Sequence, residues 1–479
     1  MAAEIEAEIC VIGGGPAGAV TAMRLAQLGR RVCLLERATF PRPHIGESLP
    51  ASIWPILRFL GVDDAMKAAG FLQSSGSVLM WGGAFERRGE PVDDPGLLVD
   101  RSRFDAILLD AARQSGVRVL QPARAYRPRR TGAGWEVPIL TAQGKGRLRA
   151  DLLVDAAGKH AGLGRRFRPA SAPLTALYAY WQAPPGFGTQ ARVEAGDAHW
   201  YWGAAQPDGT VNACIFIDPS DCTGLSPAAR RDLYLNLLAR STLLAGCLEQ
   251  ARMGPVRRCD ASSQCELTPP ADDLLRVGEA SFSVDALSSQ GVQLSMAQAM
   301  QAAVVANTIL TRPCDSNIAL GFYSGRQRER VETHAELAAA FYARHHEVTS
   351  GPFWSQRAQP LDWLRRPPAD LQNAELSPGE VLRRSPEAKL IQGGVQGDAY
   401  VVRSEILTHP NLPRPVHSLA GAELAPLISD LRDPRSVPDI LQRWSSRIGP
   451  TSAAQVLRWL WHTKILVPAG ELGRNRGSP

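Results

Sequence analysis

Runs of consecutive apolar residues predict two buried strands near the amino terminus. One run is Ile9–Ile12 and the other is Val32–Leu35. Strands that are buried on both faces of a parallel sheet read as continuous apolar runs, not as alternating ones. The stretch between the two runs has the apolar spacing of a helix. The pattern therefore predicts a strand–helix–strand unit over residues 6–37.

A different pattern follows in the middle of the chain, where segments of β-type residues predict a second sheet. These segments are 174–181, 199–204 and 211–217, with helix added over 225–250. Apolar residues return at Leu274–Val277, and a long helix is expected over about 291–310. Short segments with alternating patterns are typical of antiparallel sheets. We expect an antiparallel sheet inserted into the first domain at 169–265.

Beyond residue 350 the chain is rich in proline, and three short helical patterns follow it. They cover 420–431, 436–444 and 452–461, before the apolar run 464–467. This order predicts a small helical or winged-helix-like module at about 415–479. The expected fold is α/β: a Rossmann-like cofactor domain (1–168 and 266–350), the inserted sheet (169–265) and a carboxyl-terminal extension (351–479).

The turn after the first strand carries the first chemical signal. It reads Gly13-Gly14-Gly15-Pro16-Ala17-Gly18, and Glu36 ends the next strand. In a Gly-x-Gly-x-x-Gly turn the first glycine permits the tight turn, the second lets the backbone approach a pyrophosphate, and the third lets the helix pack on the strand. The helix start adds partial positive charge, and the acid accepts hydrogen bonds from a ribose. The sequence therefore predicts a site for an ADP-containing dinucleotide.

Composition narrows the possible partners. The 479 residues have a formal charge of +6, an excess too small to indicate nucleic acid. Eight cysteines lack any C-x-x-C pair, and no apolar run reaches the ~18 residues of a membrane span. The amino terminus is acidic, unlike a secretory signal. We expect a cytoplasmic protein with no metal, membrane or nucleic-acid site.

Two further motifs distinguish FAD from NAD. Both resemble fingerprints of glutathione-reductase-type flavoproteins. One is Gly278-Glu279 together with Ser288-Ser289-Gln290-Gly291-Val292, and the other is Val154–Gly158, earlier in the chain. Arg101, ahead of Phe104-Asp105, resembles the arginine that reaches the polar groups of the flavin in that family. The resemblance implies FAD as cofactor, held by Gly13, Gly15, Ala17, Gly18, Glu36, Arg37, Ser48, Arg101, Ala157, Gly158, Glu279, Gln290, Gly291 and Val292.

The segment His44–Pro50 narrows the family further. It is similar to the Gly-Glu-Ser segment of flavin-dependent tryptophan halogenases and their monooxygenase relatives. The resemblance places Met80 where halogenases have a lysine and Ser288 where they have a glutamate, so we expect no halogenation. The resemblance then implies hydroxylation through a flavin C4a-hydroperoxide formed with O₂, with NAD(P)H as electron donor. Candidate catalytic residues are Gln290, Glu47 and His44, and candidate substrate-contacting residues are Tyr180, Trp200 and Trp202.

The whole set of motifs resembles one subgroup, the flavoprotein monooxygenases of tryptophylquinone cofactor biogenesis for quinohemoprotein amine dehydrogenase. This resemblance implies a polypeptide partner that carries the target tryptophan. Three other functions stay open. They are a small-molecule aromatic hydroxylase of natural-product metabolism, a flavin reductase of the geranylgeranyl-reductase kind, and a DNA-binding regulator that uses the carboxyl-terminal helices.

Overall fold

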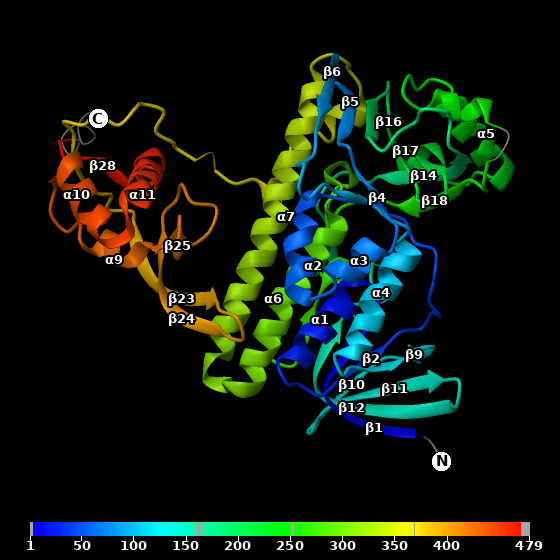
Figure 1. Cartoon of the computed structure of the whole chain (residues 1–479), viewed down its shortest axis with the longest axis horizontal. Helices are drawn as coiled ribbons and strands as arrows, with labels where there is room; N and C mark the ends of the chain where they lie inside the picture. Colours follow the sequence, from blue (N-terminus) through cyan, green and yellow to red (C-terminus); the bar gives the residue numbers. More distant parts are fainter. Residues whose placement is uncertain (1–2, 160–162, 164–165, 251–252, 368, 471–479) are drawn as a thin grey trace. The chain divides into compact units, whose positions relative to one another are not determined.

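The computed structural model describes residues 3–159, 163, 166–250, 253–367 and 369–470 (Figure 1). The chain divides into two compact units. The large unit comprises Met1–Thr311 and Arg330–Arg365, and the small unit comprises Arg312–Glu329 and Arg366–Pro479. Among the described helices none is long and apolar enough to cross a membrane.

The predicted strand–helix–strand unit is present and lies at the centre of an eight-stranded sheet in the large unit. Strand β1 (Ala3–Ile12) pairs in parallel with β2 (Val32–Leu35) on one side and with β12 (Gly144–Asp155) on the other. Helix α1 (Pro16–Gln27) connects β1 to β2, and α6 (Gly291–Thr311) packs against α1. Helix α6 is buried along most of its length because it is apolar nearly all round.

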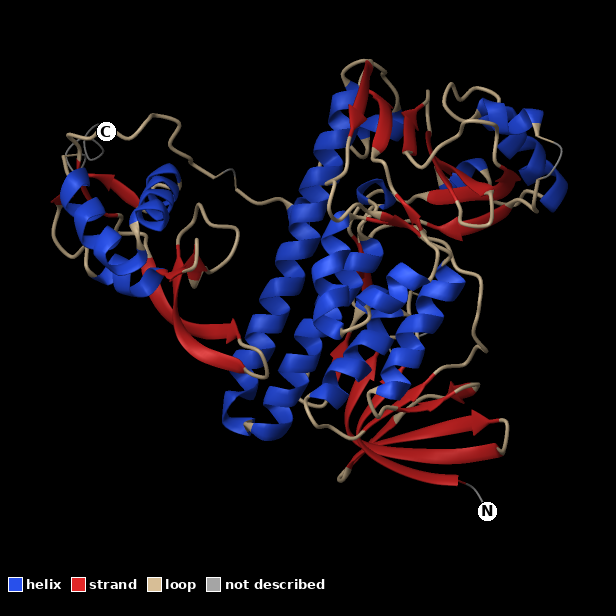
Figure 2. Ribbon diagram, in the orientation of Figure 1, coloured by secondary structure: helices blue, strands red, loops and turns tan. Residues whose placement is uncertain are grey.

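The second sheet of the large unit is larger than the predicted insertion. Its strand order is β18-β14-β17-β16-β15-β5-β6, and Figure 2 shows its strands. Five of its strands come from the predicted insertion: β14 (Thr175–Gln182), β15 (Ala191–Ala195), β16 (Trp200–Ala205), β17 (Thr210–Ile217) and β18 (Arg257–Asp260). The remaining strands, β5 (Ser77–Trp81) and β6 (Ala84–Arg88), precede residue 169. Strand β5 extends the sheet by pairing in parallel with β15.

One face of this second sheet is covered by α5 (Pro227–Leu238). Tyr234 of α5 accepts a hydrogen bond from Trp181 Nε1 at 2.9 Å and donates to the carbonyl of Ala213 at 3.0 Å. Helix α5 is shorter than the predicted helical segment 225–250, which continues as a turn and the 3-10 helix Ala245–Glu249. The opposite face of the sheet meets the loop that follows β2, as described below.

Helix α7 (Ser316–His346) was not predicted from the sequence. It runs for 31 residues and passes from the small unit into the large unit at Arg330. Its polar and apolar residues form no clear stripe along the helix. Its first part belongs to the small unit and its last part to the large unit.

The small unit contains the three predicted carboxyl-terminal helices. They are α9 (Leu424–Ser429), α10 (Val437–Ile448) and α11 (Pro450–His462). Beside them lie a three-stranded sheet, with β22 (Val381–Arg384) between β27 (Arg435–Ser436) and β28 (Leu466–Pro468), and a hairpin of β23 (Lys389–Gln396) and β24 (Val401–Thr408). The core buries Leu382, Trp444 and Leu460. The folded unit thus begins well before the predicted residue 415, because β22 supplies the centre of its sheet.

Candidate functional site

The glycine-rich turn after β1 has the geometry that a pyrophosphate requires. Gly13 has φ +109°, and a Cβ there would lie 2.3 Å from the carbonyl oxygen of Ala156. A Cβ on Gly18 would lie 1.9 Å from the carbonyl oxygen of Gly13. At Gly15, by contrast, the nearest neighbour of an added Cβ is Arg42 Nη2, at 3.4 Å. The turn therefore excludes side chains at two positions for packing and keeps space at the third, which fits a phosphate approaching the backbone.

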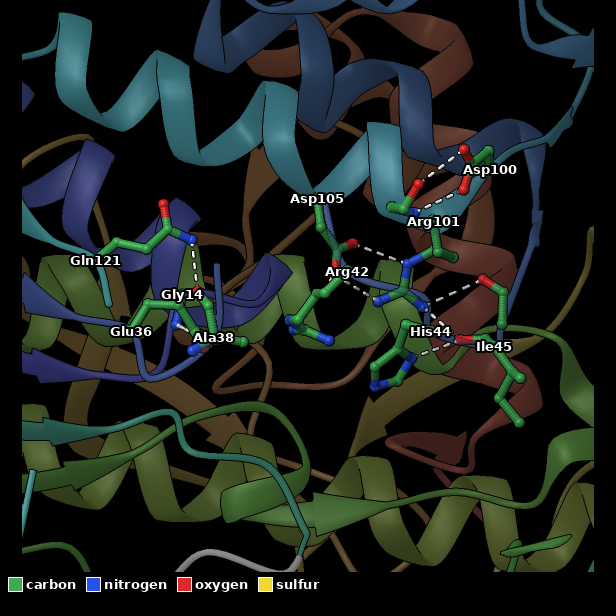
Figure 3. A network of polar contacts seen from close by, with 12 residues as sticks. Gly14, Glu36, Ala38, Arg42, His44, Ile45, Asp100, Arg101, Asp105 and Gln121 are labelled. Carbon is green, nitrogen blue, oxygen red and sulfur yellow. Dashed lines mark hydrogen bonds and ion pairs between the residues drawn. The ribbon is translucent and has the colours of Figure 1, made fainter. Parts of the chain in front are cut away.

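Glu36 is anchored beside this turn. Its Oε2 accepts a hydrogen bond from Gly14 N at 2.6 Å, and its Oε1 accepts one from Ala38 N at 2.7 Å (Figure 3). The residue is 5% exposed. Two backbone donors fix the carboxylate, and each oxygen keeps a second acceptor position. The residues present therefore fit the adenosine ribose and pyrophosphate of FAD.

Arg42 is a site residue that the sequence analysis missed. Its guanidinium lies next to Gly15, 3.5 Å from Asp105 Oδ2, and over the ring of Phe40 at 4.8 Å. Figure 3 shows it between the glycine-rich turn and Arg101. A cation at this position complements a pyrophosphate. An arginine in the loop after Glu36 was the available signal, but loop arginines have no periodicity that points to a ligand.

Arg101 holds the loop that follows Arg42. It begins α4 (Arg101–Gln114) and is 4% exposed. Its Nε and Nη2 lie 2.9 Å and 3.2 Å from the two carboxylate oxygens of Asp105, and its Nη1 donates to the carbonyls of Ile45 (2.8 Å) and Gly46 (3.3 Å). A bidentate pair of this kind fixes the guanidinium plane. The predicted flavin-contacting arginine thus positions the loop in this structure, and its contact with FAD stays a prediction.

Glu47 ends this loop and reaches the second sheet. Its Oε1 accepts hydrogen bonds from the Tyr180 hydroxyl at 2.5 Å and from Asn212 Nδ2 at 3.1 Å, while its Oε2 accepts one from Gly46 N at 2.8 Å. The side chain is buried, and this burial raises the pKa of Glu47, although the Tyr180 hydrogen bond opposes the shift. Glu47 therefore joins the cofactor side of the large unit to the face of the second sheet opposite α5.

His44 and Ser48 flank Glu47. The His44 side chain is exposed, and its Nδ1 lies 2.8 Å from the carbonyl oxygen of Ile45. Ser48 lies in the short strand β3 (Ser48–Leu49), where it pairs with Leu98. The loop thus gathers two predicted catalytic residues and one predicted cofactor residue, while Gln290 comes from another segment.

That other segment is the approach to α6. Ser289 adopts φ +49°, and Gln290 N donates to Ser288 Oγ at 3.3 Å. A Cβ on Gly46 would lie 3.9 Å from Val292 Cγ2, so the loop lies against the first turn of α6. The free backbone N–H groups of a helix start favour negative charge. This arrangement is the one expected for the pyrimidine end of a flavin.

The other predicted cofactor residues surround the same turn. Ala157 N donates to Asp155 Oδ1 at 3.1 Å, at the end of β12. Gly278 N donates to Gln298 Oε1 at 2.8 Å, and a Cβ on Gly278 would lie 2.8 Å from Ala17 Cβ. These contacts bring Ala17, Ala157, Gly158 and Glu279 to one end of the eight-stranded sheet. Arg37 follows Glu36 directly.

The predicted substrate-contacting residues differ in exposure. Tyr180 is half-buried, with its hydroxyl on Glu47. Trp202 is 8% exposed, and Trp200 is fully buried, stacked on Phe216 with ring centroids 3.7 Å apart. A fully buried ring contacts a substrate only if its neighbours move. Of the three predicted residues, Tyr180 is therefore the one whose side chain is exposed enough to contact a substrate without movement of its neighbours.

The register of the second sheet corrects the interpretation of Met80. Met80 pairs with Glu194 across β5 and β15, so the two side chains share a face. Glu194 accepts a hydrogen bond from Ser241 Oγ at 2.6 Å on the side of α5. The register across β17, β16 and β15 places Val193 on the face of Asn212 and Glu194 on the other. Met80 thus faces away from Glu47, and the residue type there carries no argument about flavin chemistry.

Lysine content offers a separate test of the halogenase chemistry. The chain has five lysines, and the large unit contains Lys67, Lys145 and Lys159. Lys67 pairs with Asp63 on α3 (Asp63–Ala68), and Lys145 is exposed at the start of β12. Lys159 follows the predicted flavin motif, but its Nζ lies 2.8 Å from Asp260 Oδ2 and 2.7 Å from the carbonyl oxygen of Ser262.

Comparison with known proteins agrees with this geometry. Residues 6–175 match the FAD binding domain family. The chain is 30% identical to tryptophan 2-halogenase of Chondromyces crocatus over 358 residues, which is 70% of this chain and 67% of the relative. It is similar to a putative FAD-dependent oxidoreductase, LodB, of Marinomonas mediterranea, with 25% identity over 74% of this chain and 95% of the relative.

Two solved structures resemble almost the whole chain. One is the peptidyl tryptophan dihydroxylase QhpG, described as essential for tryptophylquinone cofactor biogenesis, with a TM-score of 0.73, 27% identity, and coverage of 96% of this chain and 99% of that chain. The other, the flavin-dependent halogenase CmlS, has a TM-score of 0.83 and covers 97% and 96%, but at 20% identity it shows the fold alone. The chain therefore belongs to the FAD-dependent halogenase and monooxygenase family and is a flavin-dependent oxidoreductase.

Proposed function

We propose that this protein hydroxylates the indole ring of a tryptophan within a partner polypeptide, using FAD and O₂. The observation that carries the proposal is the extent of the likeness to a peptidyl tryptophan dihydroxylase. That likeness covers 96% of the chain, so it extends over both the large unit and the small unit. NAD(P)H is the proposed electron source, taken up transiently, since no second dinucleotide fingerprint is evident in the sequence.

Each part of the large unit has a task in this reaction. The turn at Gly13–Gly18, with Glu36 and Arg42, would hold the ADP part of FAD. Arg101 would fix the loop at Ile45–Glu47 against the first turn of α6, where the flavin ring is expected. When bound and reduced, FAD supplies the activation of O₂. The chain's own contribution is to orient the indole, exclude water and accept the proton that the ring loses.

Halogenation is the second candidate, because the 30% identical relative is a tryptophan halogenase. The lysine arrangement favours hydroxylation. The resemblance implies that halogenases of this group use a lysine amine to hold and aim hypohalous acid, whereas Lys159 is hydrogen-bonded to Asp260 and Ser262 and its side chain is 7% exposed. An ammonium with its donors engaged is poorly suited to hold a hypohalous acid.

The test uses FAD-loaded full-length protein with NADH or NADPH and O₂. The substrates are free tryptophan, a small phenol and peptides that contain one tryptophan each, with and without bromide, and products are read by mass spectrometry. Added oxygen on peptide tryptophan supports the proposal. Oxidation of only the free small molecules indicates the small-molecule hydroxylase, a brominated product indicates the halogenase, and reduction of an isoprenoid double bond without oxygen incorporation indicates the reductase.

A further inference from the structure

Glu47 differs in its partners from Asp105 and Glu36, two other buried carboxylates of the large unit. Asp105 is ion-paired with Arg101, and Glu36 is held by backbone N–H groups. Glu47 instead takes its two side-chain donors, Tyr180 and Asn212, from neighbouring strands of the second sheet. These two residues lie directly opposite each other in the register of β14 and β17. Their side chains therefore share a face and converge on one carboxylate oxygen.

The three residues also differ in how far their side chains are exposed, and the exposure increases from Asn212 through Glu47 to Tyr180. Asn212 is fully buried and Glu47 is 3% exposed, whereas Tyr180 is half-buried. Tyr180 is thus the member of the group with exposed surface, and a substrate can contact it without displacing the other two. Burial and the adjacent Glu47 charge raise the pKa of Tyr180 far above its usual value, so its hydroxyl stays protonated and donates to Glu47.

We infer that Tyr180, Glu47 and Asn212 form a proton relay that removes the ring proton during hydroxylation, with Asn212 as the positioning residue; this inference rests on the proposed function. Hydroxylation transfers one oxygen atom of O₂ to a ring carbon and forms a C–O bond there. The O–O bond breaks, and the second oxygen atom leaves as water with the two electrons that NAD(P)H supplies. The C–H bond at that ring carbon then breaks. Its electron pair restores the aromatic ring. The proton passes to the Tyr180 hydroxyl oxygen as the hydroxyl's own proton passes to Glu47.

The position of Glu47 supports this role. Gly46, its neighbour, lies against Val292 in the first turn of α6, and Arg101 fixes the loop backbone through Ile45 and Gly46. The relay therefore lies between the predicted flavin end and the sheet face opposite α5. The charged and titratable groups that act on Glu47 from the elements packed around it are Arg101 of α4, Tyr180 of β14, Cys214 of β17 and Cys259 of β18.

The first test follows the protonation of Glu47 without any turnover. The C=O stretch of the protonated carboxyl is measured by infrared spectroscopy against pH in FAD-loaded protein, and its loss in Glu47→Gln assigns the band. Asn212→Leu removes a donor to the carboxylate and should move the midpoint to higher pH. Asn212→Asp should move it further, because a second carboxylate disfavours ionisation. An unchanged midpoint in both variants overturns the role of Asn212.

The second test follows the reaction. Tyr180→Phe should lower turnover of the peptide substrate by about 100-fold and abolish the solvent isotope effect on that step. Tyr178→Phe is the matched control, because Tyr178 lies on the same strand and face, 6.2 Å from Tyr180 between ring centroids. Wild-type turnover in Tyr180→Phe overturns the relay. If the wild type hydroxylates no tryptophan, the proposed function fails, and the infrared titration still decides whether Asn212 holds Glu47.

Discussion

Gly14 N and Glu36 Oε2 are joined by a hydrogen bond of 2.6 Å, although 22 residues separate them in the chain. The bond ties the glycine-rich turn to the end of the neighbouring strand. It forms because β1 and β2 are adjacent and parallel, so that both segments emerge at the same edge of the sheet. The carboxylate is thus in place before a ribose arrives, which lowers the ordering cost of binding.

Gly15→Val should abolish FAD binding while the protein stays folded. The branched side chain would occupy the space in which the pyrophosphate approaches the backbone. The measurement is the visible absorbance of bound flavin after purification. Gly132→Val is the matched control, since a Cβ there meets open space among the described residues. Full flavin content in Gly15→Val would show that the cofactor binds elsewhere.

Arg42→Ala should weaken FAD binding by roughly 10-fold or more, corresponding to ~1.5–3 kcal/mol for a lost hydrogen bond to a charged group. Titration of the apoprotein with FAD, followed by flavin fluorescence, gives the dissociation constant. The control is Arg113→Ala, an exposed arginine on α4 that pairs with Asp110. Equal affinities in the two variants would remove Arg42 from the pyrophosphate site.

Arg101→Ala should destabilise the protein strongly, because it leaves Asp105 as a buried charge with Arg42, 3.5 Å away, as its remaining ionic partner. Breaking one side of a buried ion pair costs ~3–5 kcal/mol. Urea unfolding monitored by circular dichroism measures the change. The double variant Arg101→Met/Asp105→Leu should recover part of the loss. If the double variant were no more stable than Arg101→Ala, the hydrogen bonds of Arg101 to Ile45 and Gly46 would contribute more to stability than its ion pair with Asp105.

Glu47 should make the free energy of unfolding depend on pH. Burial raises its pKa in the folded state, so the unfolded chain ionises first. Its stabilising contribution is full below the ordinary glutamate pKa of 4.5 and falls as pH rises through the higher folded-state value. Glu47→Gln should flatten this decline. If the free energy of unfolding changed equally with pH in the wild type and in Glu47→Gln across that window, the raised pKa of Glu47 would be contradicted.

Bromide should give no halogenated product from peptide or free tryptophan under turnover conditions. The physical reason is that Lys159 donates to Asp260 and Ser262 and has no ammonium hydrogen bond to spare for a hypohalous acid. Asp260→Asn weakens one of these contacts, so bromotryptophan formed by this variant and not by the wild type would support this reason. Bromotryptophan from the wild type would place the protein with its halogenase relatives.

The sequence by itself determined the features that depend on local geometry and on periodicity. The Gly13–Gly18 turn was readable because its conformation and close contacts admit glycine alone at two positions. Glu36, the long helix α6 and the three helices of the small unit followed from spacing and apolar period. The FAD site was predictable for this reason: its fingerprint is confined to one strand–turn–helix unit and two short segments.

The tertiary structure decided what depends on register and on pairing between distant segments. Met80 faces α5 because of where β5 pairs with β15, and a shift of one residue would reverse the face. Glu47 meets Asn212 across 165 residues, a contact that no local pattern encodes. Trp200 stacks on Phe216 in the core, although its aromatic character equally suited a substrate surface. Side-chain direction in a sheet has a period of two, so it becomes definite only when the strands pair.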